Sequence, residues 1–197
     1  MSAQQFKAAL GEAELAFEWM QSPDDKLYTF FRQFRENDGK GKMYDTKKII
    51  LLAILVCKGG AKEKAEYLFD LFDNDANTKL DQPEITVCLT ALFDIAYEHL
   101  VDLGKDQPML EGTLDGPKIE AYKTKLRGNK EKAIKKTVGG IAGTSTTISK
   151  AGFAAKIATG EFKELVTSAG IRMAVAGDSA PVASPSANPP AEQQNQD

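Results

Sequence analysis

A stretch of twelve residues, from Asp73 to Glu84, constrains this chain more than any other part of it, and it reads D-N-D-A-N-T-K-L-D-Q-P-E. Oxygen-bearing side chains occupy its positions 1, 3, 5, 9 and 12, and these are Asp73, Asp75, Asn77, Asp81 and Glu84. At position 7, the backbone carbonyl of Lys79 offers one more oxygen. Apolar residues with helical spacing flank the stretch on both sides. This pattern predicts a loop between two helices that wraps a divalent cation.

Calcium is the ion that this set of ligands predicts. It is a hard cation that takes about six to eight oxygens in a flexible shell, and Glu84 could bind it through both of its oxygens. Four carboxylates crowded into one loop would repel one another unless a cation lay between them. We therefore expect an EF-hand loop with Ca²⁺ as its cofactor. The alternative is an acidic surface turn, because D-N-D is a common turn sequence.

Position 6 of the loop departs from the usual pattern. Glycine normally stands there, because the backbone bends sharply with a positive φ. This chain has Thr78 instead, a β-branched residue that such a conformation strains by about 1 kcal/mol or more. We expect the strain to weaken calcium binding without abolishing it.

Composition narrows the class of protein. The chain has 197 residues, 42% of them hydrophobic, and a net charge of −3, which fits one or two small domains and gives no general case for nucleic-acid binding. Cys57 and Cys88 lie in apolar helical patterns, so both are predicted to be reduced core residues of a cytoplasmic protein. Ser2 stands where myristoylation needs glycine, and no membrane anchor is expected. Catalytic motifs are also missing, so no enzyme is predicted.

Helical patterns cover most of the chain, which predicts an all-α fold with an extra N-terminal helix. The expected helices span residues 3–20, 49–57, 61–72, 82–103, 118–127, 130–138, 149–158 and 161–169. The first has an apolar seam that would either pack on its own domain or dock on a partner; it consists of Phe6, Leu10, Ala13, Phe17 and Met20. Residues 104–117 are predicted to be a loop, and the Pro-rich and Ser-rich tail from 173 is predicted to be disordered.

A second segment, Glu36 to Lys47, has the outline of another cation-binding loop. Lys40 and Lys47 occupy its positions 5 and 12, where ligands should stand, so two ammonium groups are expected to point at the place of the ion. We interpret this segment as a calcium-dead hand that is retained because such hands fold in pairs.

The stretch from Glu63 to Leu100 resembles a hand of the calmodulin superfamily, closest in style to its neuronal calcium sensor and calcineurin B-like branch. Hands of that branch commonly end in G-x-I-S-x-x-E-F before a short docking helix, and T-T-I-S-K-A-G-F, which begins at Thr146, has a similar outline. With Ile148 at position 8, the loop 141–152 would have no carboxylate ligand. The resemblance implies EF-hand helix-loop-helix pairs, with one competent hand and two degenerate ones.

Two pairings of these loops remain open. In the first, loop 73–84 pairs with loop 141–152, and loop 36–47 closes an N-terminal lobe. In the second, loop 36–47 pairs with loop 73–84, and the rest of the chain forms a degenerate helical domain. We predict an N-terminal helix with a degenerate lobe over residues 1–59, a lobe with the competent hand over 60–172, and a tail over 173–197. Between residues 118 and 136, eight basic residues accompany two acidic ones, which indicates either a docking patch for an acidic partner or a solvated helix face.

Two functions follow as expectations. The first is a regulatory or adaptor subunit that docks a target protein or peptide helix when calcium binds. The second is a constitutive structural subunit of a cytoskeletal or ciliary assembly that calcium only stabilises. The sequence indicates neither the identity of the partner nor the oligomeric state.

Overall fold

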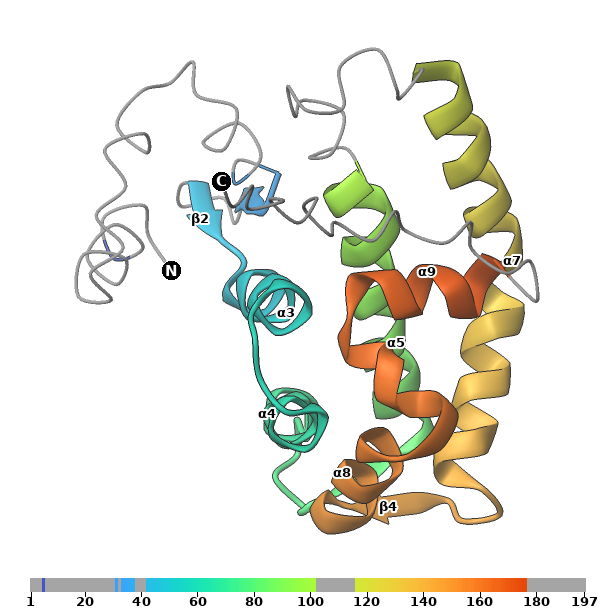
Figure 1. The fold of residues 1–197 in the computed structure, drawn as a ribbon. Helices are drawn as coiled ribbons and strands as arrows, with labels where there is room; N and C mark the ends of the chain where they lie inside the picture. The colour runs from blue at the N-terminus through green and yellow to red at the C-terminus, as the bar shows by residue number, and fades with distance from the viewer. Residues whose placement is uncertain (1–4, 6–30, 32, 38–41, 102–115, 177–197) are drawn as a thin grey trace, which may run out of the picture.

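The structure, a computed structural model, describes residues 5, 31, 33–37, 42–101 and 116–176, and it is mostly helical with short antiparallel strand pairs (Figure 1). The helix predicted at 3–20 and almost all of the loop predicted at 104–117 lie outside the described residues. None of the described helices is long and apolar enough to cross a membrane.

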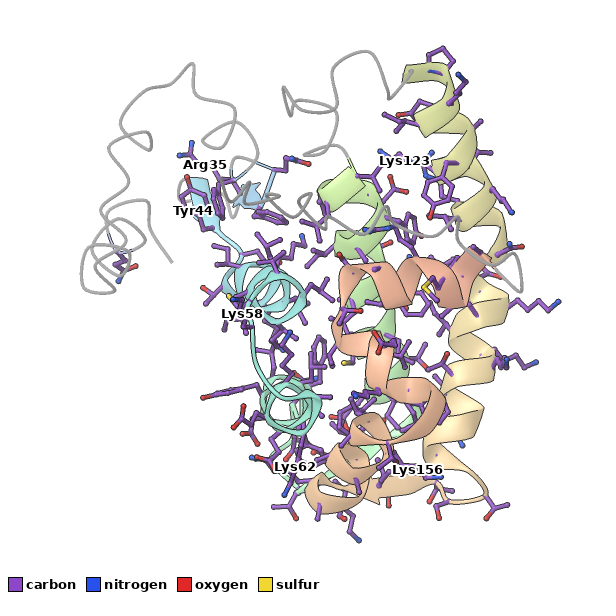
Figure 2. The ribbon with its side chains drawn as sticks, viewed as in Figure 1. Arg35, Tyr44, Lys58, Lys62, Lys123 and Lys156 are labelled. Carbon is purple, nitrogen blue, oxygen red and sulfur yellow. The ribbon has the colours of Figure 1, made fainter. Side chains whose placement is uncertain are left out.

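The first strand pair is a hairpin. Strand β1 (Arg35–Asn37) pairs antiparallel with strand β2 (Lys42–Tyr44), so segment 36–47 pairs with itself and not with another loop. The sequence favours this because Asp38-Gly39, between the strands, is a strong hairpin signal. Tyr44 is buried and its hydroxyl accepts a hydrogen bond of 2.7 Å from Arg35 Nη2 (Figure 2). Segment 36–47 was predicted to be a calcium-dead hand that pairs with another hand; its described part instead forms this hairpin.

Helix α3 (Thr46–Val56) follows the hairpin directly. Asp45 begins it, since its Oδ1 accepts the backbone N–H of Lys48 at 3.2 Å and so satisfies one of the free donors of the first turn. Its last residue, Val56, and the following Cys57 are exposed. The prediction that Cys57 is a core residue is therefore wrong, whereas Cys88 is fully buried as predicted and burial raises the pKa of its thiol.

The predicted cation loop lies between two helices. Helix α4 (Ala61–Phe72) confirms the helix predicted at 61–72, and strand β3 (Lys79–Asp81) leads from the loop into helix α5 (Gln82–Asp94). The chain then continues into η2 (Ile95–His99), one turn of π-helix, so the helix predicted at 82–103 changes its winding before it reaches Leu100. Within this turn the carbonyl of Ala96 accepts a hydrogen bond of 3.1 Å from Arg172, which belongs to helix α9 (Ser168–Ala176).

Helix α7 (Gly116–Ala142) is a single helix where two had been predicted, over 118–127 and 130–138. Gly128 separates the two predicted segments, but a glycine inside a helix costs only about 1 kcal/mol relative to alanine. Ion pairs on both sides of Gly128 hold the helix to the rest of the fold, because Arg127 binds Glu98 and Lys130 binds Asp94.

The C-terminal part returns to the cation loop. Strand β4 (Thr147–Ser149) pairs antiparallel with β3, with Leu80 opposite Ile148. Helix α8 (Lys150–Ala158) follows, and then the 3₁₀ helix η4 (Gly160–Val166). The helix predicted at 161–169 is therefore this 3₁₀ helix together with the start of α9. The boundary of the tail predicted at 173 is also wrong, because α9 continues to Ala176.

One cluster of buried apolar residues joins the described elements from α3 to α9. Helices α4 and α8 pack against each other, and the ring centroids of Phe69 and Phe153 lie 6.2 Å apart between them. Figure 1 shows α5 between α4 and α7, and α7 runs along one edge of the molecule. The division into domains at residues 59 and 60 stays a prediction.

Candidate metal centre

Three carboxylates converge at the junction of α4, the loop and α5. Asp73, Asp75 and Glu84 each place one carboxylate oxygen so that the three oxygens lie within 4.8 Å of one another. Asp73 directly follows the last residue of α4, and Glu84 lies in the first turn of α5. The ends of two packed helices therefore bring the first and last residues of the loop together.

Backbone N–H groups of the loop point at these carboxylates. Asp73 accepts the N–H of Asn77 and the N–H of Thr78, each at 3.1 Å. Glu84 accepts the N–H of Asn74 at 3.1 Å through Oε1 and that of Asp81 at 3.2 Å through Oε2. Each ionised carboxylate oxygen has about two acceptor positions, so one position per oxygen is left for a cation.

The remaining predicted ligands lie in the loop but outside this group of three carboxylates. The amide of Asn77 donates to Asp75 at 2.6 Å and its oxygen accepts the N–H of Lys79 at 2.8 Å. Asp81 acts as the N-cap of α5, accepting the N–H of Glu84 at 2.8 Å. A residue at position 9 often reaches the ion through a water molecule, so the capping role does not conflict with binding.

Two non-glycine residues of the loop have positive φ. Ala76 has φ of 55° and Thr78 has φ of 64°, both in the left-handed region that disfavours side chains with a Cβ atom. The strain predicted for position 6 is therefore present in the backbone. Glu84 accepts the N–H groups of Asn74 and Asp81, near the two ends of the loop. These hydrogen bonds hold the short loop in this conformation despite the backbone strain.

Replacing Thr78 by glycine should raise the free energy of unfolding by about 1 kcal/mol, because glycine adopts this φ without the steric cost. Urea unfolding without added calcium measures the change. Thr144→Gly is the matched control: Thr144 is an exposed turn residue whose φ is not positive, so glycine should lower stability there. Equal effects of the two substitutions would show that Thr78 carries no strain.

The loop opposite β3 is shorter than the sequence predicted. Five residues lie between Ala142, at the end of α7, and Ile148, whereas seven lie between Phe72 and Leu80. Ile141, expected at position 1 of a degenerate loop, is a buried residue of α7. The predicted register 141–152 is therefore wrong at its start, because burial of Ile141 and Ala142 extends the helix. No residue from 143 to 149 carries a carboxylate.

Lys47 contacts the cation loop and not its own segment. Its Nζ donates to the side-chain oxygen of Asn74 at 2.9 Å and lies 5.3 Å from the centroid of the Phe72 ring. The prediction that Lys47 points at an ion position of segment 36–47 is therefore wrong. Lys40 lies outside the described residues. The contact between Lys47 and Asn74 could not be predicted from local pattern, since the two residues belong to different predicted hands.

A second set of charged residues holds the far end of α5 and η2 against α7. Asp94 binds Lys130, and Glu98 binds both Arg127 and, at 3.3 Å, Lys123. The side chain of Lys123 is only 6% exposed, and its ammonium group lies 3.3 Å from Glu98 and 4.0 Å from Glu120. We call these ion pairs the α5–α7 clamp. These ion pairs were not predicted from the sequence. The one signal for them is that Asp94 and Glu98 are four residues apart and that Lys123 and Arg127 have the same spacing on α7.

The clamp affects the titration of the groups within it. Hydrogen bonding to Arg127 is the main cause that lowers the pKa of Glu98 from its usual 4.5, with burial acting in the opposite direction and Lys123 adding to the lowering. Glu98 in turn raises the pKa of Arg127. Burial, together with the charges of Asp94 and Glu98, raises the pKa of Tyr97 to about 12.

Replacing Glu98 by glutamine should lower the free energy of unfolding at neutral pH by about 2 kcal/mol, because charged hydrogen bonds are lost and Lys123 stays buried. Folding lowers the pKa of Glu98 below its usual 4.5. The stabilisation by the ionised Glu98 is therefore fully present at pH values above about 4.5, and it is lost as the pH falls through the lower pKa of the folded protein. Unfolding curves at several pH values test this. The control Glu131→Gln, at an exposed side chain of the same helix α7, should change stability by less than about 0.5 kcal/mol. A difference between wild type and Glu98→Gln that persists unchanged at pH 3 would contradict the assignment.

The centre thus consists of oxygen ligands only, supplied by one short loop between two helices. Among the described residues, Asp73, Asp75 and Glu84 are the group of His, Cys, Asp and Glu side chains that converges closely enough to hold a metal ion. No family model matches this chain, and no curated protein matches it either.

Proposed function

We propose that Asp73–Glu84 is an EF-hand loop that binds calcium, and that the protein is a regulatory or adaptor subunit that docks a target protein in a calcium-responsive way. The observation that carries the proposal is the convergence of the carboxylates of Asp73, Asp75 and Glu84 within 4.8 Å. Three carboxylates at that separation repel one another, and a divalent cation would offset the repulsion.

The ligand chemistry favours calcium over transition metals. Carboxylate, amide and carbonyl oxygens suit calcium, magnesium or manganese, while zinc and copper favour sites with nitrogen or sulfur ligands. Glu84 binding through two oxygens, Asp73, Asp75, the amide oxygen of Asn77 and the carbonyl of Lys79 would supply about six oxygens, and a water held by Asp81 about one more. To bind, Asn77 would exchange its hydrogen bonds to Asp75 and Lys79 for the ion.

Pairing of β3 with β4 supports a paired arrangement of hands. Leu80 is fully buried opposite Ile148, at the position where two EF-hand loops would join through their short strands. The second loop, from Gly143 to Ser149, would act as a support that holds the competent loop without binding an ion. This favours the pairing of 73–84 with the C-terminal remnant over a pairing with 36–47.

Calcium would act on the rest of the molecule through α5. Drawing Glu84 toward the ion would shift the first turn of α5, and this helix presents five buried residues to the core, Ile85, Cys88, Leu89, Leu92 and Phe93. A tilt of α5 would expose part of this apolar face to a target helix.

The α5–α7 clamp favours a second candidate function. Asp94 and Glu98 fix the far end of α5 and η2 to α7, so the loop can close on an ion while the helix keeps its place. In that case calcium would stabilise a constitutive structural subunit without exposing a docking surface.

One comparison distinguishes the two candidates. Hydrogen exchange and the fluorescence of a dye that binds apolar surface would be measured with calcium and with a chelator. Faster exchange along α5 and η2 and stronger dye binding in calcium support the sensor, whereas protection confined to residues 73–84 supports the structural subunit. Partners would also be captured from lysate with the wild type and with Asp73→Ala, in calcium and in chelator. This measures whether partner binding depends on the ion. The absence of any calcium effect on exchange would overturn both.

A further inference from the structure

The exposed side of α7 carries a row of lysines. Residues 118, 125, 132 and 136 are all lysines, and all four are exposed. With about 100° per residue, they fall within about 40° of one another around the helix axis, and the row is about 27 Å long at 1.5 Å per residue. We call this row the lysine stripe. The four lysines are exposed to solvent, and the helix that carries them runs along one edge of the molecule (Figure 1).

The stripe is separate from the α5–α7 clamp. Lys123, Arg127 and Lys130 point from the other side of the same helix toward Asp94 and Glu98. Among the described residues, no hydrogen bond or ion pair engages Lys125, Lys132 or Lys136. The acidic residues of this helix, Glu120 and Glu131, lie about 100° or more away from every lysine of the stripe. The positive charges of Lys125, Lys132 and Lys136 are therefore not neutralised by acidic residues of their own helix.

We propose that the lysine stripe docks the protein on the surface of an anionic phospholipid bilayer. The lysines of the stripe are exposed on a helix whose apolar side is already buried in the core, so the stripe can contact a membrane surface without inserting into it. Lysine is a compact charge on a long flexible stem, which suits attraction to many headgroup phosphates at once.

Other anionic partners fit the stripe less well. A protein interface needs a well-packed apolar centre, and Tyr122, 38% exposed, is the one large apolar side chain beside the stripe among the described residues of α7. Single-stranded nucleic acid requires several aromatic side chains for stacking, and base recognition in a duplex commonly uses arginine, which the stripe does not contain. A lipid surface requires only positive charge, which the stripe supplies.

Co-sedimentation of the full chain with vesicles tests the proposal. The vesicles contain equimolar phosphatidylserine and phosphatidylcholine, or phosphatidylcholine alone, and a chelator is present so that the cation loop plays no part. The wild type should bind the anionic vesicles only, and binding should vanish as salt rises from about 0.1 M to about 0.5 M. The variant Lys125→Gln/Lys132→Gln/Lys136→Gln should lose about 100-fold in binding, at roughly fivefold for each lysine.

The matched control removes the same charge elsewhere. Lys58→Gln/Lys62→Gln/Lys156→Gln alters exposed lysines that follow α3 or lie on α4 and α8 (Figure 2), and it should lose less than about threefold. Equal losses in the two triple variants, or no preference of the wild type for anionic vesicles, would overturn the proposal. So would tighter binding of polyglutamate or duplex RNA than of the vesicles at the same salt concentration.

Discussion

Replacing Glu84 by glutamine should lower the calcium affinity of the protein by about 100-fold or more. Glu84 is the residue that joins the exit helix α5 to the rest of the loop, and it can offer two oxygens to the ion. Substitutions in the shell outside metal ligands already cost roughly 10- to 100-fold in affinity, so loss of a charged ligand should cost at least as much. Glutamine keeps the shape and can still accept the N–H of Asn74 or Asp81, so the fold should persist. Isothermal titration calorimetry measures the affinity.

Glu63→Gln is the matched control for this substitution. Glu63 also lies in the first turn of a helix, where its Oε2 accepts the N–H of Gly60 at 3.3 Å, but it belongs to α4 and is outside the loop. Its replacement should leave the affinity within about twofold, because the loop keeps all its ligands. If both variants bind calcium like the wild type, Glu84 is not a ligand. If both lose affinity equally, the effect reflects charge in general and not the loop.

Replacing Phe153 by alanine should lower the free energy of unfolding by about 3–5 kcal/mol. The ring of Phe153 is 1% exposed and lies 6.2 Å from the ring of Phe69, so its loss leaves a cavity between α8 and α4. Whole domains are stable by only about 5–15 kcal/mol, so this single change should remove a large part of the stability. Urea unfolding followed by circular dichroism gives the value.

Tyr67→Ala is the control for the Phe153 substitution. Tyr67 is an aromatic residue of α4 that is 68% exposed, so its removal should change stability by less than about 0.5 kcal/mol. A loss below about 1 kcal/mol for Phe153→Ala would show that α4 and α8 do not pack as described, and it would also remove the support for β3 and β4 as a paired unit.

Local signals in the sequence were sufficient for the loop and its first helix. The oxygen spacing from Asp73 to Glu84 led to the three carboxylates that converge, and Gly60 before an apolar helical pattern marked the start of α4. The conflict at Thr78 was also visible, because a β-branched residue in a position that needs positive φ must be strained. In each of these cases, the residues that determine the local structure lie within a few positions of it in the sequence.

The features that were predicted wrongly depend on contacts between residues that are distant in the sequence. Gly128 suggested a break in a helix, but ion pairs from Arg127 and Lys130 to residues of another helix keep α7 continuous. Burial of Ile141 against the core carries α7 past Gly139 and Gly140, and Gly143, with φ of 61°, ends it. Segment 36–47 was assigned as a degenerate hand on its loop outline, although Lys40 and Lys47 occupy ligand positions, while its turn sequence favoured a hairpin that closes on itself. Tertiary packing overrides local preference in such cases.

The most direct test of the central claim is a count of bound calcium ions by native mass spectrometry, with the protein at neutral pH and calcium in millimolar excess. One ion per chain is expected for the wild type and none for Asp73→Ala, because the loop from Asp73 to Glu84 holds the three convergent carboxylates while residues 143–149 carry none. A wild-type chain that binds no calcium, or an Asp73→Ala chain that binds as many ions as the wild type, would contradict the account.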